Sequence, residues 1–307
     1  MTDTQKEVFK TPVNKIRLFE HGAPGSQNLK LTRKYYTEDM PDGRVKHIVQ
    51  NITDPDIVPY IPDGIGNSTD RQRIPAVLII PGGAFRRLVY NFEGEDVAKW
   101  LNSMGIAAFV LECRLPSDEH DNAEDVPLID AMRAMRVIRG RAQEFGIDEA
   151  KIGVMGFSAG GFMAALLSTA YESDVYADYK YKDEYDKLSA RPDFAVCSYP
   201  VISIDDCIEA GKRYMSEEQV LERISDRKAK ILHKYNPDKL VRPDMPPVFI
   251  CETDDDRTTL SENSVGFYMA ARKAGVSAEL HIFRTGGHGY GCGDDFAQTG
   301  EWKVLFT

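Results

Sequence analysis

A Gly-x-Ser-x-Gly motif between a strand-like and a helix-like segment is the feature that most constrains this chain. Residues 152–157 form an apolar run. Its last two residues begin the motif Gly156-Phe157-Ser158-Ala159-Gly160, and an apolar helix-like stretch follows. A serine at a sharp strand-to-helix turn exposes its hydroxyl at the top of a parallel sheet. The motif therefore predicts a nucleophilic Ser158. By letters alone, an ordinary glycine-rich turn between a strand and a helix is the alternative.

A histidine is needed as general base, because a serine hydroxyl is a weak nucleophile near neutral pH. In this architecture the base comes last in the chain, on a loop after the final strand. Among six histidines, His288 fits, because it lies in the glycine-rich run 285–291 just after the strand-like residues 278–283. Three of the others precede Ser158, which is the wrong chain order: His21, His47 and His120. His281 alternates with apolar residues in that strand, and His233 lies in a charged helical stretch.

The acid that orients this histidine is expected after the buried strand at residues 247–251, where the chain continues as Glu-Thr-Asp-Asp-Asp-Arg. A carboxylate there can accept a hydrogen bond from one imidazole nitrogen and stabilise the imidazolium. Three adjacent aspartates leave the choice open on physical grounds: Asp254, Asp255 and Asp256. Such a cluster could also bind a metal, but no His or Cys lies at ligand spacing around it. We expect neither a metal nor a cofactor.

The oxyanion hole is expected in the turn after the early buried strand at residues 76–80, where the chain reads Pro-Gly-Gly-Ala-Phe. A glycine-rich turn at this place can direct backbone N–H groups at a developing negative charge. We assign the donors to Gly83, Ala84 and Ala159, the residue after the nucleophile.

Taken together, these segments resemble the α/β-hydrolase superfamily and, within it, the acetylesterase and lipase-like carbohydrate esterases, which include acetyl xylan and feruloyl esterases. The resemblance covers roughly residues 45–295. It is carried by residues 81–85, 93–95, 97–102, 105–111, 127–131, 133–136, 151–161, 198–203, 245–250 and 286–291.

The resemblance implies an α/β-hydrolase fold, a mostly parallel sheet with helices on both faces, and it implies Asp256 as the acid. Two departures from the family pattern are visible. The family usually has a proline in the turn after the acid, where this chain has Thr259-Leu260, so Asp255 stays an alternative. The final helix is also usually longer than residues 301–307 allow, which predicts a shortened or frayed C-terminal helix.

Strand-like and helix-like segments alternate from residue 76 onward, which favours a parallel sheet covered on both faces. We expect one domain of 307 residues, in which residues 1–70 form an N-terminal extension with the first strands and residues 71–307 form the catalytic unit. Apolar periodicity predicts helices over residues 94–104 and 128–145. Residues 171–192, rich in tyrosine, and residues 205–240, with a charged helix at 217–224, interrupt the alternation. We expect both to leave the sheet near its carboxyl end as cap segments. The tyrosines could stack on sugar rings, and a solvated surface insertion is the plainer alternative.

Composition excludes several classes of function. The net charge is −10 and there is no basic stripe, so we expect no nucleic-acid partner. No apolar run is long enough to span a membrane, and the first residues lack a signal pattern, so the expected location is cytoplasmic, or secreted if a signal was removed. The five cysteines are scattered and read as reduced. The oligomeric state is left open.

The leading hypothesis is a serine esterase that removes acetyl or other small acyl groups from a plant-type carbohydrate such as xylan, so the expected partner is a small-molecule or oligosaccharide ester. The alternatives are a general short-chain carboxylesterase, a serine peptidase, and a hydrolase fold that binds a ligand without catalysis.

Overall fold

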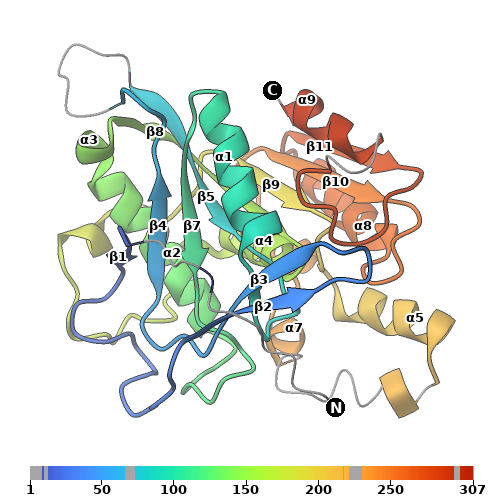
Figure 1. Cartoon of the computed structure of the whole chain (residues 1–307), viewed down its shortest axis with the longest axis horizontal. Coiled ribbons are helices and arrows are strands. Elements are labelled where there is room, and N and C mark those ends of the chain that lie inside the picture. Colours follow the sequence, from blue (N-terminus) through green and yellow to red (C-terminus); the bar gives the residue numbers. More distant parts are fainter. Residues whose placement is uncertain are drawn as a thin grey trace.

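The computed structural model describes residue 9 and residues 13–65, 73–216, 218–220, 230–293 and 298–306. Its centre is an eight-stranded sheet in the order β1-β4-β7-β5-β8-β9-β10-β11 (Figure 1). The six strands from β7 to β11 run parallel. At one edge β4 pairs antiparallel with β7, and β1 pairs antiparallel with β4. The bounds in sheet order are β1 Ile16–Arg17, β4 Asp56–Tyr60, β7 Ala107–Glu112, β5 Ile74–Ile80, β8 Ile147–Phe157, β9 Ala195–Ser198, β10 Val248–Thr253 and β11 Ala278–Phe283.

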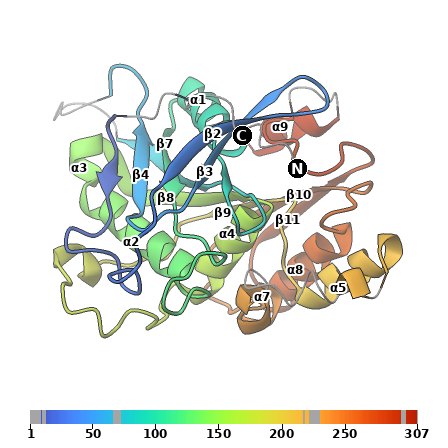
Figure 2. The same ribbon diagram turned by 60° about the horizontal axis from the view of Figure 1, so that its bottom comes forward.

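Helices cover both faces of this sheet, as the alternation of segments predicts. Figure 2 shows α1 and α9 on one face and α2, α4 and α8 on the other. The α-helices are α1 Asp96–Ser103, α2 Val126–Gly140, α3 Ala142–Phe145, α4 Ala159–Ala170, α5 Ile204–Tyr214, α7 Lys230–Lys234, α8 Ser261–Lys273 and α9 Trp302–Phe306. Short 3₁₀ turns are η2 Glu184–Lys187, η4 Pro237–Lys239 and η5 Thr299–Glu301, and η1, Asn91–Glu95, is a π-helix directly before α1.

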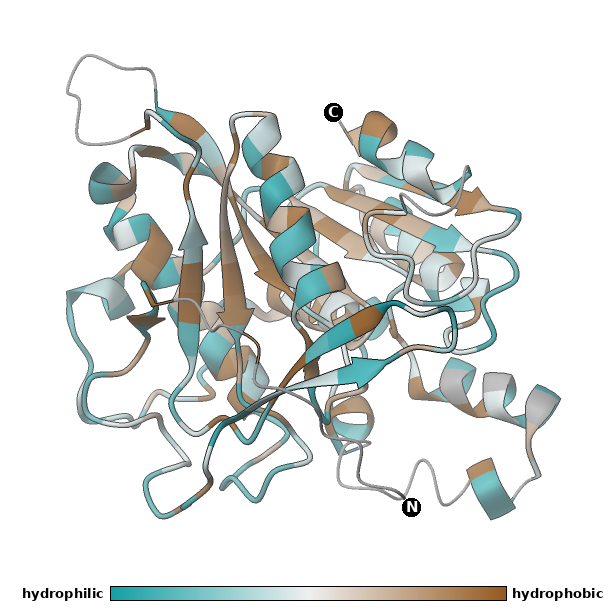
Figure 3. Ribbon diagram, viewed as in Figure 1, coloured by the Kyte–Doolittle hydropathy of each residue, from teal (hydrophilic) through white to brown (hydrophobic). Residues whose placement is uncertain are grey.

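Burial on both faces explains why the central strands are almost wholly apolar. All six residues of β7 are buried, as are the last five of β5. Helix α4 is buried along nearly its whole length, because the sheet covers one side and α2 the other. Figure 3 shows this apolar centre with polar residues on the outer helices and loops. No helix in the described ranges is both long and apolar enough to cross a membrane.

A small antiparallel sheet is attached to the turn where we expect the oxyanion hole. It has the order β2-β3-β6, with β2 at Lys34–Asp39, β3 at Val45–Gln50 and β6 at Leu88–Val89. Strand β6 begins two residues beyond the end of the Pro-Gly-Gly-Ala-Phe turn, so pairing with β3 restrains this turn.

Two helices differ from their expected bounds. The helix expected at 94–104 is the π-helix η1 followed by α1. The helix expected at 128–145 is divided into α2 and α3, although its apolar periodicity is continuous. The Tyr185 ring packs against Gly140 so closely that a Cβ there would lie 2.3 Å from a ring carbon, and the chain departs from helical geometry at Arg141.

The segment at 171–192 does not lie where we expected a cap. Helix α4 begins at the carboxyl edge of the sheet and runs back, so Tyr171 emerges near the amino ends, where its hydroxyl contacts Asp244. The segment then packs along α2, where Arg133 binds Asp183 and Asp186. Tyr171 and Tyr176 are buried, which leaves them no face for a sugar ring.

Residues 205–240 do leave the carboxyl edge, because Ser203, the N-cap of α5, follows soon after β9. From the far end of this segment, Lys234 and Tyr235 return to bind Asp125 beside the start of α2. The charged helix expected at 217–224 lies mostly outside the described residues. The C-terminal helix α9 is short, as expected, and spans five residues.

Candidate active site

Ser158 occupies the turn between β8 and α4, with a backbone φ of 54° and ψ of −118°. This conformation is unfavourable for a residue with a side chain. The surroundings impose it, because the Ser158 N–H donates to the Ser198 carbonyl at 3.0 Å and the Ser158 carbonyl accepts from Phe162 and Val201. The turn is also crowded, since a Cβ on Gly160 would lie 1.9 Å from the Ile80 carbonyl oxygen.

His288 is on the loop after β11 and reaches the serine. Its Nε2 lies 2.8 Å from Ser158 Oγ, and its Nδ1 lies 2.6 Å from Asp256 Oδ2. The structure thus places Ser158, His288 and Asp256 in one hydrogen-bonded chain. Such a chain can move a proton from the hydroxyl to the imidazole while the carboxylate fixes the tautomer.

Asp256 is held as an ionised acceptor. Its Oδ1 accepts from the backbone N–H groups of Thr258 and Thr259, at 2.7 and 2.9 Å, and its Oδ2 accepts from the Thr259 hydroxyl at 3.0 Å. Burial raises the pKa of Asp256, but the hydrogen bond and charge of His288 and these backbone donors outweigh burial and hold it below its usual range. The carboxylate is therefore charged when the imidazole needs a partner.

Asp255 lies on the other side of the histidine loop and does not touch the imidazole. Its Oδ1 accepts from the N–H groups of Gly286 and Gly287 at 3.0 and 2.8 Å. Asp254 is tied to β11 through its backbone N–H, which donates to Phe283. Of the three adjacent aspartates, the structure brings Asp256 to His288.

The turn that carries Gly83 and Ala84 packs against the nucleophile, since a Cβ on Gly82 would lie 2.9 Å from Ser158 Cβ. Gly83 and Ala84 have φ angles of 137° and 57°, and Ala159 is the first residue of α4. None of the hydrogen bonds within the described part of the chain uses the N–H of these three residues. The positive end of the α4 dipole adds to the field at this place. These N–H groups are therefore available as donors, as an oxyanion hole requires.

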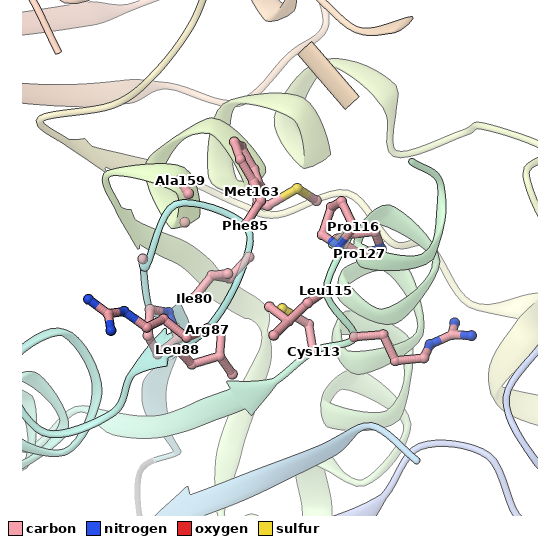
Figure 4. Close-up of a pocket in the computed structure, with 14 residues that line it drawn as sticks. Ile80, Phe85, Arg87, Leu88, Cys113, Leu115, Pro116, Pro127, Ala159 and Met163 are labelled. Atoms are coloured by element: carbon pink, nitrogen blue, oxygen red, sulfur yellow. The ribbon is translucent and has the colours of Figure 1, made fainter. Parts of the chain in front are cut away.

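A small apolar pocket adjoins this turn (Figure 4). Its free volume is about 20 Å³, which is room for a group of about methyl size. Ala159 lies at its rim and the Arg87 guanidinium points away from it. The remaining lining is mostly apolar, with Ile80, Phe85, Leu88, Cys113, Leu115, Pro116, Pro127 and Met163.

The sequence did not predict a role for three further residues around Ser158, His288 and Asp256. Thr259 stands in the turn where the family pattern has proline, and it supplies a hydroxyl and an N–H that proline lacks. Glu93 and Tyr199 fall within the segments that carry the resemblance, but no motif assigns them a role. Among the described residues, no group of three or more His, Cys, Asp or Glu side chains could hold a metal ion.

The fold and this site define the serine-hydrolase class of α/β hydrolases. The family model named BD-FAE matches residues 65–270. The chain belongs to this family, the bifunctional feruloyl and acetyl esterases of the α/β-hydrolase fold.

Individual relatives agree with this assignment. An acetylxylan esterase of Xylanibacter ruminicola is 31% identical over 72% of this chain and 42% of its own length. Endo-1,4-beta-xylanase B of Butyrivibrio fibrisolvens is 31% identical over 74% of this chain and 34% of its own length. The chain thus spans less than half the length of these curated relatives. The crystal structure of an acetyl ester-xyloside bifunctional hydrolase from Caldicellulosiruptor lactoaceticus superposes with a TM-score of 0.69 at 34% identity, covering 96% of this chain and 94% of that one.

Proposed function

We propose that this chain is a serine esterase that removes acetyl or other small acyl groups from a carbohydrate of the xylan type. The observation that carries the proposal is the hydrogen-bonded chain from Ser158 through His288 to Asp256. The family and the relatives support an ester as the substrate.

In the acylation half, Ser158 Oγ attacks the ester carbonyl carbon and His288 Nε2 takes the hydroxyl proton. Asp256 holds the Nδ1–H and stabilises the imidazolium. The oxyanion of the tetrahedral intermediate accepts hydrogen bonds from the amides of Gly83, Ala84 and Ala159. Each such donor is typically worth about 3 kcal/mol of barrier. His288 then gives its proton to the sugar oxygen as the C–O bond breaks.

In the deacylation half, water takes the place of the sugar alcohol. His288 removes a proton from this water, which attacks the acyl carbon while the same amides bind the oxyanion. Collapse of the intermediate returns the proton to Ser158 Oγ and releases acetate. These steps need no cofactor, because the side chains and amides supply every proton transfer and charge contact.

A small apolar acyl group is supported by the small apolar pocket that Gly82, Ala159 and Gly160 line next to the nucleophile. The sugar alcohol is supported by the names of the relatives, an acetylxylan esterase and an acetyl ester-xyloside hydrolase. A net charge of −10 also favours a neutral oligosaccharide over a polyanion.

The test is a substrate panel that includes 4-nitrophenyl esters from acetate to octanoate, methyl ferulate and acetylated xylo-oligosaccharide. Ser158→Ala is the control for every substrate. We expect acetate release from the oligosaccharide, rates that fall with acyl length, and loss of both in the variant while its circular dichroism stays unchanged.

Other outcomes separate the alternatives. Hydrolysis of the small esters alone would indicate a general short-chain carboxylesterase. Near-normal activity of Ser158→Ala would remove the proposed nucleophile, and inactivity of the wild type on all esters would favour the peptidase or the non-catalytic ligand-binding fold.

A further inference from the structure

Glu93 is a buried carboxylate directly behind the oxyanion turn, and the mechanism above does not use it. Its side chain is on the π-helix η1, and only 5% of the residue is exposed. Its Oε2 accepts from the Gly82 N–H at 2.8 Å, and its Oε1 accepts from the Tyr199 hydroxyl at 3.0 Å. The charge of Lys46 also acts on this carboxylate. Single-turn π-helices occur frequently at functional sites.

Tyr199 connects this carboxylate to the histidine loop. Its hydroxyl accepts from the Gly291 N–H at 3.0 Å, three residues after His288. Its ring lies edge-on to the imidazole, with centroids 5.1 Å apart, and its backbone carbonyl oxygen lies 3.3 Å from the Thr259 hydroxyl oxygen. The residue is fully buried, with a φ of 36°, so its position is fixed by these contacts.

These hydrogen bonds are the ones that an ionised Glu93 accepts. The Gly291 N–H must donate to the Tyr199 oxygen, so the tyrosine proton is free to donate to Glu93, and the Gly82 N–H donates to the other carboxylate oxygen. A protonated carboxyl would direct its own proton at one of these donors. Burial raises the pKa of Glu93 above its usual range, and the charge of protonated His288, the two donors and the charge of Lys46 offset only part of that rise.

We propose that Glu93 and Tyr199 are a pair of positioning residues that hold the oxyanion turn and the His288 loop in register, and that the Glu93 carboxylate also stabilises the imidazolium of His288. The inference rests on the function proposed above, since it assumes that His288 acts as the base for Ser158. Neither residue touches the reacting atoms. They act through Gly82, Gly291 and the imidazole.

Several groups besides Glu93 face His288 and influence how stable its protonated form is. Asp256 and the Thr259 hydroxyl face Nδ1, Ser158 faces Nε2, and the Tyr199 ring faces one side. The buried Glu252 stands behind Asp256 and interacts with it. The Glu93 carboxylate adds a further negative charge that acts on His288, to which it is joined through Tyr199. Removal of this charge leaves protonated His288 less stabilised.

Two variants remove these groups with little change of shape. Glu93→Gln keeps an oxygen for the Gly82 N–H and removes the charge. Tyr199→Phe keeps the ring against His288 and removes the hydroxyl that joins Glu93 to Gly291. Glu95→Gln is the matched control, because Glu95 ends the same π-helix but pairs with Lys99 at the surface.

We would measure kcat and KM on 4-nitrophenyl acetate across the pH range, with active sites counted by an organophosphate that labels Ser158. Counting active sites removes any unfolded fraction from the comparison. We expect Glu93→Gln and Tyr199→Phe to lower kcat by about 10- to 100-fold with little change in KM. In Glu93→Gln the acid limb of the pH–rate profile should move to lower pH, and in Tyr199→Phe it should move less. The double variant should be little worse than the poorer single variant, because the two residues act as one unit.

The proposal is overturned if Glu93→Gln keeps kcat within about twofold and the same acid limb as the wild type and Glu95→Gln. It is also overturned if the kcat losses of the two variants multiply in the double variant. Failure of the proposed function looks different, since the wild type would then not hydrolyse esters or Ser158→Ala would remain active.

Discussion

Asp255 and Asp256 are neighbours in the chain, yet their carboxylates hold the histidine loop from two sides. Asp256 Oδ2 lies 2.6 Å from His288 Nδ1, whereas Asp255 Oδ1 accepts from the N–H groups of Gly286 and Gly287. One carboxylate therefore acts on the imidazole and the other on the backbone that carries it.

Substitution of the two aspartates should separate these effects. Asp256→Asn should lower kcat by about three to four orders of magnitude, because an amide favours the wrong imidazole tautomer. Asp255→Asn keeps an oxygen acceptor for the loop and should stay within about threefold of the wild type. Steady-state kinetics on 4-nitrophenyl acetate checks both. The reverse ranking of the two variants would make Asp255 the acid and contradict the geometry.

The backbone at Ser158 should make glycine more stable than alanine there. Both Ser158→Gly and Ser158→Ala lose the hydroxyl, but only glycine adopts a φ of 54° and ψ of −118° without steric cost. Glycine relieves this strain in the folded state, but it also has more conformational freedom in the unfolded chain. The net effect should make the unfolding free energy of Ser158→Gly about 1 kcal/mol larger than that of Ser158→Ala. Urea unfolding of the two inactive proteins measures the difference. Equal stabilities would mean that the turn carries no such strain.

Asp118 and His120 should make opposing contributions to stability in acid. Their side chains approach to 3.8 Å. Burial, with the charge of Arg114, lowers the pKa of His120 to about 4, and burial raises the pKa of Asp118 to about 6. In the unfolded chain these values are about 6.5 and about 3.9. As the pH falls from 6.5 to 4, the unfolded histidine gains a proton that the folded one refuses, so stability falls. Over the same range folded Asp118 gains a proton first, so its contribution rises.

His120 makes the folded protein less stable in acid, and Asp118 offsets this loss. The variant Asp118→Asn should therefore be more sensitive to acid than the wild type. Between pH 6.5 and 4.5 we expect this variant to lose about 2 kcal/mol more unfolding free energy than the wild type. His120→Gln should show the opposite trend and gain stability relative to the wild type as the pH falls. Urea unfolding at three pH values tests both, and parallel profiles for all three proteins would refute the prediction.

Trp302 should anchor the short C-terminal helix and the histidine loop together. It is fully buried, its ring meets Trp100 edge-on at 5.0 Å, and its Nε1–H donates to the Gly291 carbonyl at 3.2 Å. Trp302→Ala should cost about 3–5 kcal/mol of stability. Leu305→Ala, at a residue 43% exposed on the same helix, should cost no more than about 0.5 kcal/mol. Thermal and urea unfolding compare them, and similar losses would contradict an anchoring role.

Local sequence patterns predicted the elements that carry the site. The Gly-x-Ser-x-Gly motif between an apolar run and a helix predicted the β8–α4 turn, because few residues fit so crowded a bend. The position of His288 after the last strand followed from chain order. The choice among three adjacent aspartates did not, because each stands after β10 and spacing does not distinguish their directions.

The sequence by itself determined the strand and helix order, the Ser158 turn and the chain order of the residues that meet there, because these depend on periodicity and on residues that few backbones accommodate. Tertiary structure decided what depends on direction and on contacts between distant segments. It turned Asp256 rather than Asp255 toward the imidazole and laid residues 171–192 along α2, since α4 carries the chain away from the carboxyl edge. It also joined Glu93 to Tyr199, residues 106 positions apart that no local pattern connects.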